Sequence, residues 1–261
     1  MKDMSLQLFN LEGRVAVVLG GTSGIGRTLA LGLAEAGADV VSSGRRQSHV
    51  DEVAAEIEKL GRKTVRKSVD ASSRSSIDSL RDAILQAFGR VDILLNAAGQ
   101  TFRKPTADVT EDEWSKLMDV NVNGTLRACQ SFYEPLRNSG QGRVINIASL
   151  TSYLGFLEVT AYATSKSAIL GLTRNLAVEW APKGINVNAI APGVFRTELN
   201  SALLDGTDRG RELLMRTPMK RFGQTAELVG AAIFLASDAS KFVTGQCIGV
   251  DGGFLASGVN S

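Results

Sequence analysis

Short apolar runs alternate with longer helical patterns along the whole chain. The runs are almost continuously hydrophobic, which is typical of strands covered on both faces of a parallel sheet. Seven are predicted to be strands, over residues 14–19, 38–42, 64–69, 91–95, 143–147, 185–190 and 247–250. Helices are predicted between them, over residues 24–36, 49–60, 73–88, 111–136, 161–180 and 226–236. The alternation predicts an α/β fold, a doubly wound parallel sheet of about seven strands with helices on both faces.

Glycines follow four of the predicted helices and mark where those helices end, at Gly37, Gly61, Gly89 and Gly184. A chain of 261 residues has room for one large α/β domain or two small ones. No low-complexity linker or short internal repeat divides it. We therefore predict a single domain over residues 1–261, with a variable, partly helical substrate lid at about 194–218.

The composition excludes several classes of function. Apolar residues make up 44% of the chain and charged residues 21%, which is ordinary for a soluble protein with a core. The net charge of +2, without a Lys/Arg-rich run, predicts no nucleic-acid partner. No apolar run approaches the ~18–20 residues that span a bilayer, and residues 1–10 lack a signal-peptide pattern. We expect a cytoplasmic protein that binds no membrane.

Metal and acyl-enzyme chemistry are also excluded by the residues present. His49 is the single histidine, and Cys129 and Cys247 lie far apart, so a His/Cys zinc site lacks ligands. A serine hydrolase would have to use His49, and no Gly-x-Ser-x-Gly motif is present. We expect no metal, a solvated His49, and two buried thiols.

A glycine-rich turn follows the first predicted strand and opens the first helix. Glycine permits the tight turn and the close approach of a diphosphate, while the helix N-terminus favours its negative charge. The spacing is Gly-x-x-x-Gly-x-Gly, and ordinary strand–helix turns also use glycine. The position between strand and helix favours a dinucleotide site that includes Gly20, Thr22, Ser23, Gly24, Ile25 and Gly26.

The end of the second predicted strand informs the choice of cofactor. NAD-type sites place an acidic residue ~20 residues beyond the glycines, where it binds ribose hydroxyls. Here that position is Gly44, and Arg45 and Arg46 follow it. Guanidinium groups bind phosphate, so NADP(H) is favoured and NAD(H) remains possible. The alternative interpretation of the two arginines is a solvated basic loop.

A tyrosine and a lysine share one face of a predicted helix. Tyr162 and Lys166 are spaced i, i+4, and a neighbouring ammonium stabilises phenolate. Such a pair is usually only a helix surface. Ser149 supports a catalytic interpretation because it follows a strand, at the carboxyl edge where open α/β sheets bind ligands. Asn121 lies in an apolar stretch and is predicted to be a satisfied core amide or a polar relay.

These motifs together resemble the short-chain dehydrogenase/reductase family, whose fold is of the Rossmann type. The resemblance covers nearly the whole chain. Matching segments are 20–26, Asp70, 96–99, Asn121, Ser149, 162–166, 192–193 with Thr197, and 250–253. Two departures are Leu19, where a threonine is usual, and Ala97, which replaces the second asparagine of Asn-Asn-Ala-Gly.

The resemblance implies a role for each matching residue. Tyr162 would be the general acid/base, Lys166 would lower its pKa and bind the nicotinamide ribose, and Ser149 would orient the substrate oxygen. Asn121 would hold a water that links Lys166 to solvent. The other implied cofactor contacts are Asp70 and Ala71 at the adenine, Asn96, Ala97, Ala98 and Gly99 at the adenosine ribose, and Pro192, Gly193, Phe195 and Thr197 at the nicotinamide amide and diphosphate. The family also implies a homotetramer, with helices 111–136 and 161–180 forming one interface and residues 251–253 another.

The substrate is less constrained than the reaction. Polar residues available to the predicted pocket include Gln100, Arg103 and Glu158, whereas a steroid or acyl-chain site would contain more apolar side chains. Segments 102–104, 216–218 and 220–223 resemble the gluconate 5-dehydrogenase branch, which acts on sugar acids. The expected substrate is a sugar acid, polyol or related small polar carbonyl. Alternatives are a 3-oxoacyl-[acyl-carrier-protein] reductase and a non-catalytic dinucleotide sensor.

Two charged residues bear on the substrate. Arg103 follows the 96–99 motif and Glu158 precedes Tyr162, so both are predicted to lie in the cleft with Gln100, Ser149 and Tyr162. They are expected on opposite walls, with the guanidinium binding a substrate carboxylate and Glu158 binding sugar hydroxyls. The alternatives are a salt bridge at the rim or two solvent-facing side chains.

Overall fold

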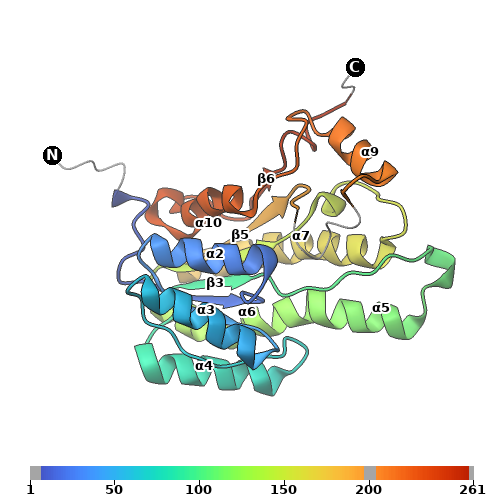
Figure 1. The fold of residues 1–261 in the computed structure, drawn as a ribbon. Helices are drawn as coiled ribbons and strands as arrows, with labels where there is room; N and C mark the ends of the chain where they lie inside the picture. The colour runs from blue at the N-terminus through green and yellow to red at the C-terminus, as the bar shows by residue number, and fades with distance from the viewer. Residues whose placement is uncertain (1–6, 197–203, 259–261) are drawn as a thin grey trace.

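One parallel sheet organises the computed structural model, which describes residues 7–196 and 204–258 (Figure 1). Its six strands lie in the order β2-β1-β3-β4-β5-β6. Their bounds are β1 (Val15–Leu19), β2 (Asp39–Ser43), β3 (Ile93–Asn96), β4 (Gly142–Ile147), β5 (Ile185–Pro192) and β6 (Cys247–Val250). Strand β1 pairs with both β2 and β3, so the strand order reverses beside β1. Open α/β sheets bind ligands at such a point, and the predicted α/β fold is confirmed.

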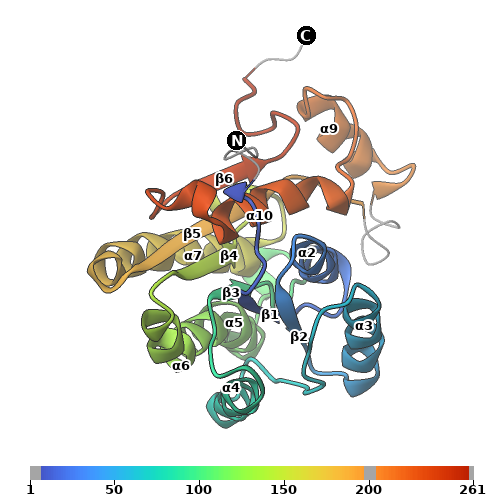
Figure 2. The same ribbon diagram turned by 90° about the vertical axis from the view of Figure 1, so that its left-hand side faces the viewer.

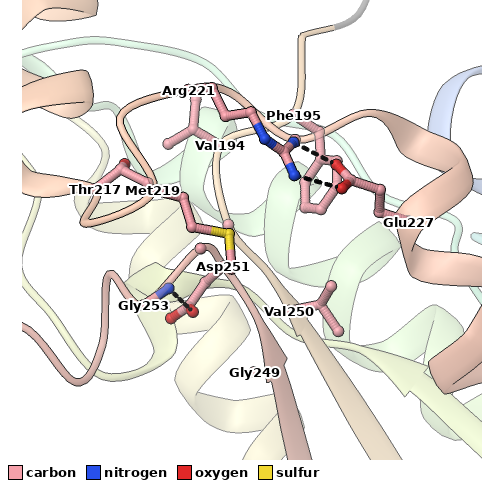
Figure 3. A pocket seen from close by; sticks show the side chains of 13 residues that line it. Val194, Phe195, Thr217, Met219, Arg221, Glu227, Gly249, Val250, Asp251 and Gly253 are labelled. Carbon is pink, nitrogen blue, oxygen red and sulfur yellow. Dashed lines mark hydrogen bonds and ion pairs between the residues drawn. The ribbon is translucent and has the colours of Figure 1, made fainter.

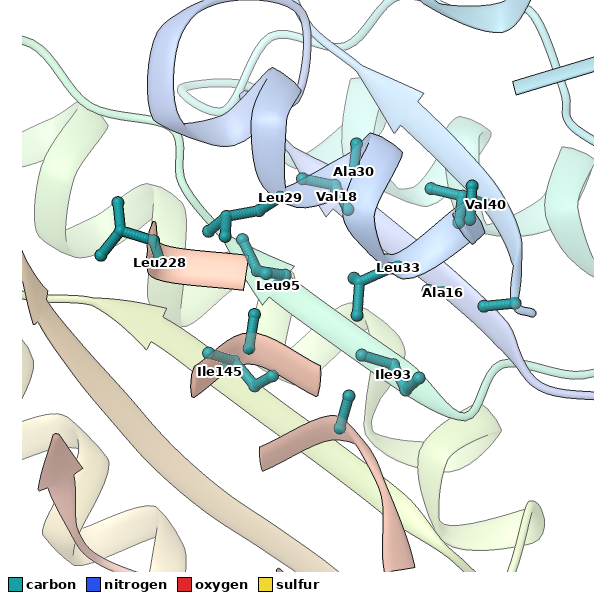
Figure 4. Close-up of a cluster of buried hydrophobic side chains, with 14 of the residues drawn as sticks. Ala16, Val18, Leu29, Ala30, Leu33, Val40, Ile93, Leu95, Ile145 and Leu228 are labelled. Carbon is teal, nitrogen blue, oxygen red and sulfur yellow. The ribbon is translucent and has the colours of Figure 1, made fainter. Parts of the chain in front are cut away.

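Helices cover both faces of the sheet (Figure 2). On one face, α2 (Gly24–Glu35), α3 (Gln47–Lys59) and α10 (Val229–Ala236) pack on the strands. On the other face lie α4 (Arg74–Phe88), α6 (Gly124–Asn138) and α7 (Thr160–Trp180). Figure 4 shows the first of these cores, in which Leu29 and Leu33 of α2 face Val18 and Leu95 of the strands. Successive strand residues point to opposite faces, so the continuous apolar runs fill two cores.

The predicted seventh strand, over residues 64–69, is absent from the sheet. This segment runs beside β2 but bonds to it only at isolated points: Val40 N–H donates to Lys63 O at 3.2 Å and Val69 N–H to Gly44 O at 3.0 Å. Within the segment only Val69 is buried. An edge segment with so little apolar surface does not form a continuous ladder, so the prediction of a strand there is wrong.

The long helix predicted over 111–136 is divided into α5 (Glu111–Met118) and α6 by a π-helical stretch over Asp119–Asn123. A capping box starts α5, because the Thr110 side chain accepts from Glu113 N–H and the Glu113 carboxylate accepts from Thr110 N–H. π-Helical turns often occur at functional sites, and this one contains Asn121. The four glycines predicted to end helices all have positive φ, from +71° to +111°.

The predicted lid is described at residues 194–196 and 204–218. Its helical part is α9 (Asp208–Arg216), which starts after Thr207, whose side chain accepts from Gly210 N–H at 3.0 Å. Leu213 of α9 packs with Leu204, Leu150 and Phe254. Residues 197–203, and with them Thr197, lie outside the described residues. In the described part of the chain, no helix combines the length and apolar character needed to cross a membrane.

Candidate active site

Parallel pairing brings the carboxyl ends of the strands to one edge of the sheet. The chain leaves this edge at the positions where the sequence predicts site residues, after Leu19, Ser43, Asn96, Ile147 and Pro192. Segments far apart in the sequence therefore meet there: the glycine turn, the arginines, the 97–99 segment, Ser149 and Gly193.

The turn between β1 and α2 fits a diphosphate. A Cβ on Gly26 would lie 2.1 Å from Gly20 O, and a Cβ on Gly20 would lie 2.5 Å from Ala98 N, so both positions require glycine. Gly24 has φ of +50° and open space around its Cα. The Ser23 side chain makes no capping hydrogen bond, and the first amides of a helix have no carbonyl partner within it. The turn therefore offers open space and N–H donors at a helix N-terminus.

Arg45 and Arg46 follow β2 as exposed side chains. Next to them, the Asp70 carboxylate accepts from Ser72 Oγ at 2.7 Å and Ser72 N–H at 2.9 Å. These hydrogen bonds, with a smaller influence from Arg45, lower the pKa of Asp70. The Arg45 charge thus lies close enough to act on a carboxylate that the family resemblance places at the adenine.

Gly44 is closed to larger side chains. A Cβ there would lie 2.6 Å from Oγ1 of Thr22, which is itself buried. The tight contact between these residues joins the end of β2 to the glycine turn. A substitution at Gly44 would therefore disturb the turn as well as change the local charge.

Ser149, Tyr162 and Lys166 converge at the carboxyl edge, as the sequence predicts. The Ser149 side chain hydrogen-bonds to Tyr162, and its Oγ also accepts from Thr151 N–H at 3.2 Å. Lys166 is 6% exposed; its Nζ donates to Ile147 O at 2.7 Å and lies 5.7 Å from the centre of the Tyr162 ring. One hydroxyl, one phenol and one ammonium therefore lie in a single cluster.

Burial controls proton affinity in this cluster. It raises the pKa of Tyr162 above its ordinary value, while the hydrogen bond with Ser149 opposes the rise. Burial also lowers the pKa of Lys166 to about 8. Low-dielectric surroundings disfavour charge, whether it is a phenolate or an ammonium. Tyr162 is accordingly a protonated phenol at neutral pH, able to donate a hydrogen bond to a carbonyl oxygen.

Asn121 is a satisfied buried amide. Its Oδ1 accepts from Gln100 N–H at 2.8 Å, and its Nδ2 donates to Gln100 O at 2.9 Å and to Ser165 Oγ at 3.0 Å. Ser165 in turn donates to Tyr162 O at 2.7 Å. A Cβ on Gly99 would lie 3.4 Å from Asn121 Oδ1 and 3.8 Å from Lys166 Nζ. Asn121 thus fixes both the 99–100 segment and the start of α7 around the lysine.

Ser152 joins two segments of the site, a role that the sequence analysis did not predict. Its Oγ donates to Lys166 O at 2.8 Å and accepts from Ser149 N–H at 3.2 Å. The hydroxyl therefore joins the turn that carries Ser149 to the helical turn that carries Lys166. The signal in the sequence is the Ser-x-x-Ser spacing, which forms a capping box here.

Several residues predicted to contact the cofactor are buried and pack against neighbouring segments at the carboxyl edge. Asn96 is 5% exposed and donates from Nδ2 to Asn146 Oδ1 at 2.9 Å, so its side chain points into the sheet. Ala71 is buried beside Gly124, where a Cβ would lie 3.0 Å from Ala71 O. Ala97 and Ala98 line the glycine turn, since added Cβ atoms on Gly26 and Gly20 would meet them.

A cavity of about 400 Å³ adjoins the edge at the ends of β5 and β6 (Figure 3). Gly193 and Phe195 line it, together with Asp251, whose carboxylate accepts from Gly253 N–H at 2.9 Å. Arg221 closes one side through a bidentate pair with Glu227, at 2.6 and 2.7 Å. The lining of the cavity includes two of the predicted cofactor residues but none of Ser149, Tyr162 and Lys166, so the cavity is distinct from the cluster that these three residues form.

The charged residues predicted for the substrate cleft contact one another. Arg103 Nη2 lies 2.6 Å from Glu158 Oε2, and the two side chains are 38% and 32% exposed. This contact is the salt bridge that the sequence analysis left open as an alternative to opposite walls. The Gln100 side chain donates to Lys116 O at 3.0 Å.

Comparisons with known proteins agree with this geometry. The family model described as Enoyl-(Acyl carrier protein) reductase matches residues 20–255. The 2-dehydro-3-deoxy-D-gluconate 5-dehydrogenase of Dickeya dadantii is 41% identical, covering 97% of this chain and 100% of that protein. The gluconate 5-dehydrogenase of Gluconobacter oxydans is 38% identical, covering 96% and 98%. A crystal structure of a gluconate 5-dehydrogenase from Burkholderia cenocepacia in complex with NADP and tartrate has a TM-score of 0.93 at 39% identity, covering 97% and 100%.

The fold, the strand-edge cluster and these full-length similarities define an oxidoreductase that acts on CH–OH groups. The chain belongs to the short-chain dehydrogenase/reductase family, as its motifs indicated.

Replacing Ser152 by alanine tests its positioning role. The change removes two hydrogen bonds, and a displacement costing about 1–2 kcal/mol in the reacting geometry lowers kcat about 5- to 30-fold. We expect Ser152→Ala to lower kcat with little change in the dissociation constant for cofactor. Ser167→Ala is the control, because its exposed hydroxyl reaches only Ser152 O, at 3.3 Å. Equal losses in both variants would contradict the role, as would a kcat unchanged in Ser152→Ala.

Proposed function

We propose that this protein interconverts the secondary alcohol and the ketone of a sugar acid, such as a gluconate, with NADP(H). The observation that carries the proposal is the cluster of Ser149, Tyr162 and Lys166 at the same sheet edge as a glycine turn that fits a diphosphate. Relatives named for gluconate and 2-dehydro-3-deoxy-D-gluconate support the substrate class.

The proposed proton transfer uses three residues. In ketone reduction the Tyr162 phenol donates its proton to the carbonyl oxygen, and in alcohol oxidation Tyr162 takes that proton back. Ser149 donates a hydrogen bond to the same oxygen and orients it. The Lys166 ammonium, held by Ile147 O, stabilises phenolate. The nicotinamide, when bound, supplies or accepts the hydride.

The two directions should differ in their dependence on pH. Burial raises the pKa of Tyr162, so the phenol stays protonated through neutral pH. Reduction needs that protonated form and loses rate as pH rises through the pKa of Tyr162. Oxidation needs the phenolate and gains rate over the same range.

The proposed cofactor site extends along the edge from the glycine turn. Gly20 and residues 22–26 would hold the diphosphate, and Arg45 and Arg46 the 2′-phosphate. Asp70 and Ala71 would contact the adenine, and residues 96–99 the adenosine ribose. Pro192, Gly193 and Phe195, with Thr197 outside the described residues, would contact the nicotinamide amide and diphosphate. Relatives solved with NADP support the choice of cofactor.

A substrate panel tests the function directly. Sugar acids, polyols and 3-oxoacyl thioesters would be assayed with NADP(H) and NAD(H) in parallel. The proposal expects the highest kcat/KM for a sugar acid with NADP(H). A preference for acyl thioesters would indicate a 3-oxoacyl reductase instead, and binding of NADP(H) without turnover of any carbonyl would indicate a dinucleotide sensor.

Tyr162→Phe should abolish turnover, because the substitution removes the hydroxyl that carries the exchangeable proton. The rest of the side chain is kept, so cofactor binding should not change. General acid–base catalysis contributes on the order of 10²–10⁴-fold, so kcat should fall by that factor while fluorescence titration shows unchanged NADPH binding. Tyr133→Phe is the matched control, since Tyr133 packs on Trp180 with ring centres 5.0 Å apart. A Tyr162→Phe variant that keeps more than about a tenth of the wild-type kcat would remove Tyr162 from this role.

Replacing Arg45 and Arg46 by alanine tests the phosphate selectivity. Hydrogen bonds to charged groups contribute about 1.5–3 kcal/mol, so NADP(H) affinity should fall about tenfold or more while NAD(H) affinity changes little. Arg66→Ala is the control, because Arg66 pairs with Glu58 at 2.5 Å. A wild-type protein that binds NAD(H) more tightly than NADP(H) would show that the arginines form only a basic loop. This test is sharper than Gly44→Asp, which would also displace Thr22.

We also propose a homotetramer, supported by apolar surface on two regions. Val178 of α7 is 80% exposed, and Phe242, close before β6, is fully exposed. In the described part of the chain, β6 pairs only with β5, so its outer edge is open. Large exposed apolar side chains and open strand edges are typical of subunit interfaces. Light scattering should give four times the chain mass, and Val178→Asp should reduce it; a monomeric wild type would refute the assembly.

A further inference from the structure

A turn over residues 251–255 directly follows β6 and is folded by its own hydrogen bonds. The Asp251 carboxylate accepts from Gly253 N–H at 2.9 Å and from Leu255 N–H at 2.8 Å. Gly252 and Gly253 have φ of +64° and +89°, which residues with a side chain rarely adopt. The path of the 251–255 turn is therefore fixed by its own residues.

The 251–255 turn is also fixed to two other segments of the chain. A Cβ on Gly193 would lie 2.5 Å from Asp251 Cα, so the turn packs tightly on the residue that follows β5. Met219 N–H donates to Gly252 O at 3.2 Å, which joins the turn to the segment that follows α9. The turn is thus a support whose position is set by the carboxyl edge of the sheet.

Phe254 extends from this turn into a cluster that joins three parts of the chain. Its side chain is 2% exposed and packs with Leu150 and with Leu213 of α9. Its ring centre lies 6.0 Å from that of Phe156, with 38° between the ring planes. The Arg216 guanidinium of α9 lies 5.3 Å from the same ring centre, within the range of a cation–π interaction. One aromatic ring therefore contacts both α9 and the segment after Ser149.

The helix α9 depends on this cluster for its place in the fold. Gly210 and Leu213 are its buried residues. Gly210 packs on the chain just before the helix, since a Cβ there would lie 1.9 Å from Leu204 O. Figure 1 shows α9 apart from the two helical layers that cover the sheet, with the segment after β6 beside it. The contacts of Leu213 and Arg216 with Phe254 thus hold α9 at its position.

We propose that Phe254 is a positioning residue: it holds α9 against the turn that carries Ser149, so that the 251–255 turn fixes one wall of the substrate cleft. Leu150 directly follows Ser149, so the packing of Phe254 on Leu150 sets the distance between α9 and the catalytic serine. Without the ring, α9 would keep mainly its local contacts and would open more often. The substrate used in the test rests on the proposed function, whereas the anchoring of α9 does not.

Amide hydrogen exchange, followed by mass spectrometry, tests the anchoring without need of a substrate. In Phe254→Ala the amides of α9 should exchange about tenfold or more faster, while those of β4 keep their protection. Phe9→Ala is the matched control, because Phe9 packs on Phe234 with the same 38° between ring planes, at 6.5 Å, and both lie outside the cluster around Phe254. Phe254→Leu keeps apolar volume and should lie in between; it replaces Phe254→Ala if that variant fails to fold.

Steady-state kinetics with D-gluconate and NADP test the effect on the substrate cleft. Phe254→Ala should lower kcat/KM about tenfold or more, mainly through a higher KM, and leave the dissociation constant for NADPH unchanged. Phe254→Leu should recover part of the loss, and Phe9→Ala should match the wild type. The inference is overturned if α9 exchanges equally fast in Phe254→Ala and Phe9→Ala. It is also overturned if Phe254→Ala weakens NADPH binding as much as it raises KM, which would indicate a general loss of structure.

The two measurements separate this inference from the proposed function. Faster exchange of α9 in Phe254→Ala, in a protein whose wild type turns over no sugar acid, would sustain the anchoring and refute the reaction. Turnover of sugar acids with a kcat/KM unaffected by Phe254→Ala would sustain the reaction and overturn the positioning role of Phe254.

Discussion

Parallel pairing of six strands is the constraint on which the rest of the structure depends. It sends every strand's carboxyl end to one edge, so each chain exit there adds a residue to the same region. The register of β3 with β4 aligns Asn96 with Asn146, two positions before Ala98 and Ala148. A slip of one residue would reverse which side chains face each core and would misplace the turns that follow. The chemistry at the edge is thus inherited from the register of the buried strands.

The amino ends of the strands, on the opposite side of the sheet from the carboxyl edge, have a different role. Asp92 is fully buried and accepts from Val15 N–H at 2.9 Å and from Arg90. Arg14, also buried, pairs with Asp238 at 2.5 Å and donates to Ala236 O at 2.8 Å. Removing one partner of such a buried pair leaves an uncompensated charge, which is strongly destabilising. The amino edge thus joins the strands to α10, while the carboxyl edge leaves polar groups free to meet a ligand.

At the carboxyl edge, hydrogen bonds from neighbouring residues hold the ionisable groups in place. Burial raises the pKa of Tyr162 and lowers the pKa of Lys166, so it disfavours the charged form of each side chain. The hydrogen bonds around the two residues set where these side chains lie. Ser152 and Ser165 supply two of those bonds, each joining the backbone of α7 to a segment that carries another site residue. The cluster is therefore preorganised by neighbours that do not belong to the reacting set.

The sequence by itself determined the α/β fold, the glycine turn and the shared face of Tyr162 and Lys166, because each depends on local periodicity or on one residue's conformational freedom. It also predicted that Ser149 would join them, since parallel strands end at one edge. It also predicted a seventh strand over residues 64–69. That strand does not form, because strand propensity does not show whether a neighbouring strand will pair with the segment along its length. Only the tertiary structure decided that Arg103 contacts Glu158 and that Ser152 joins Ser149 to Lys166. Those contacts join segments far apart in the chain, and their geometry follows from packing, which local sequence patterns do not encode.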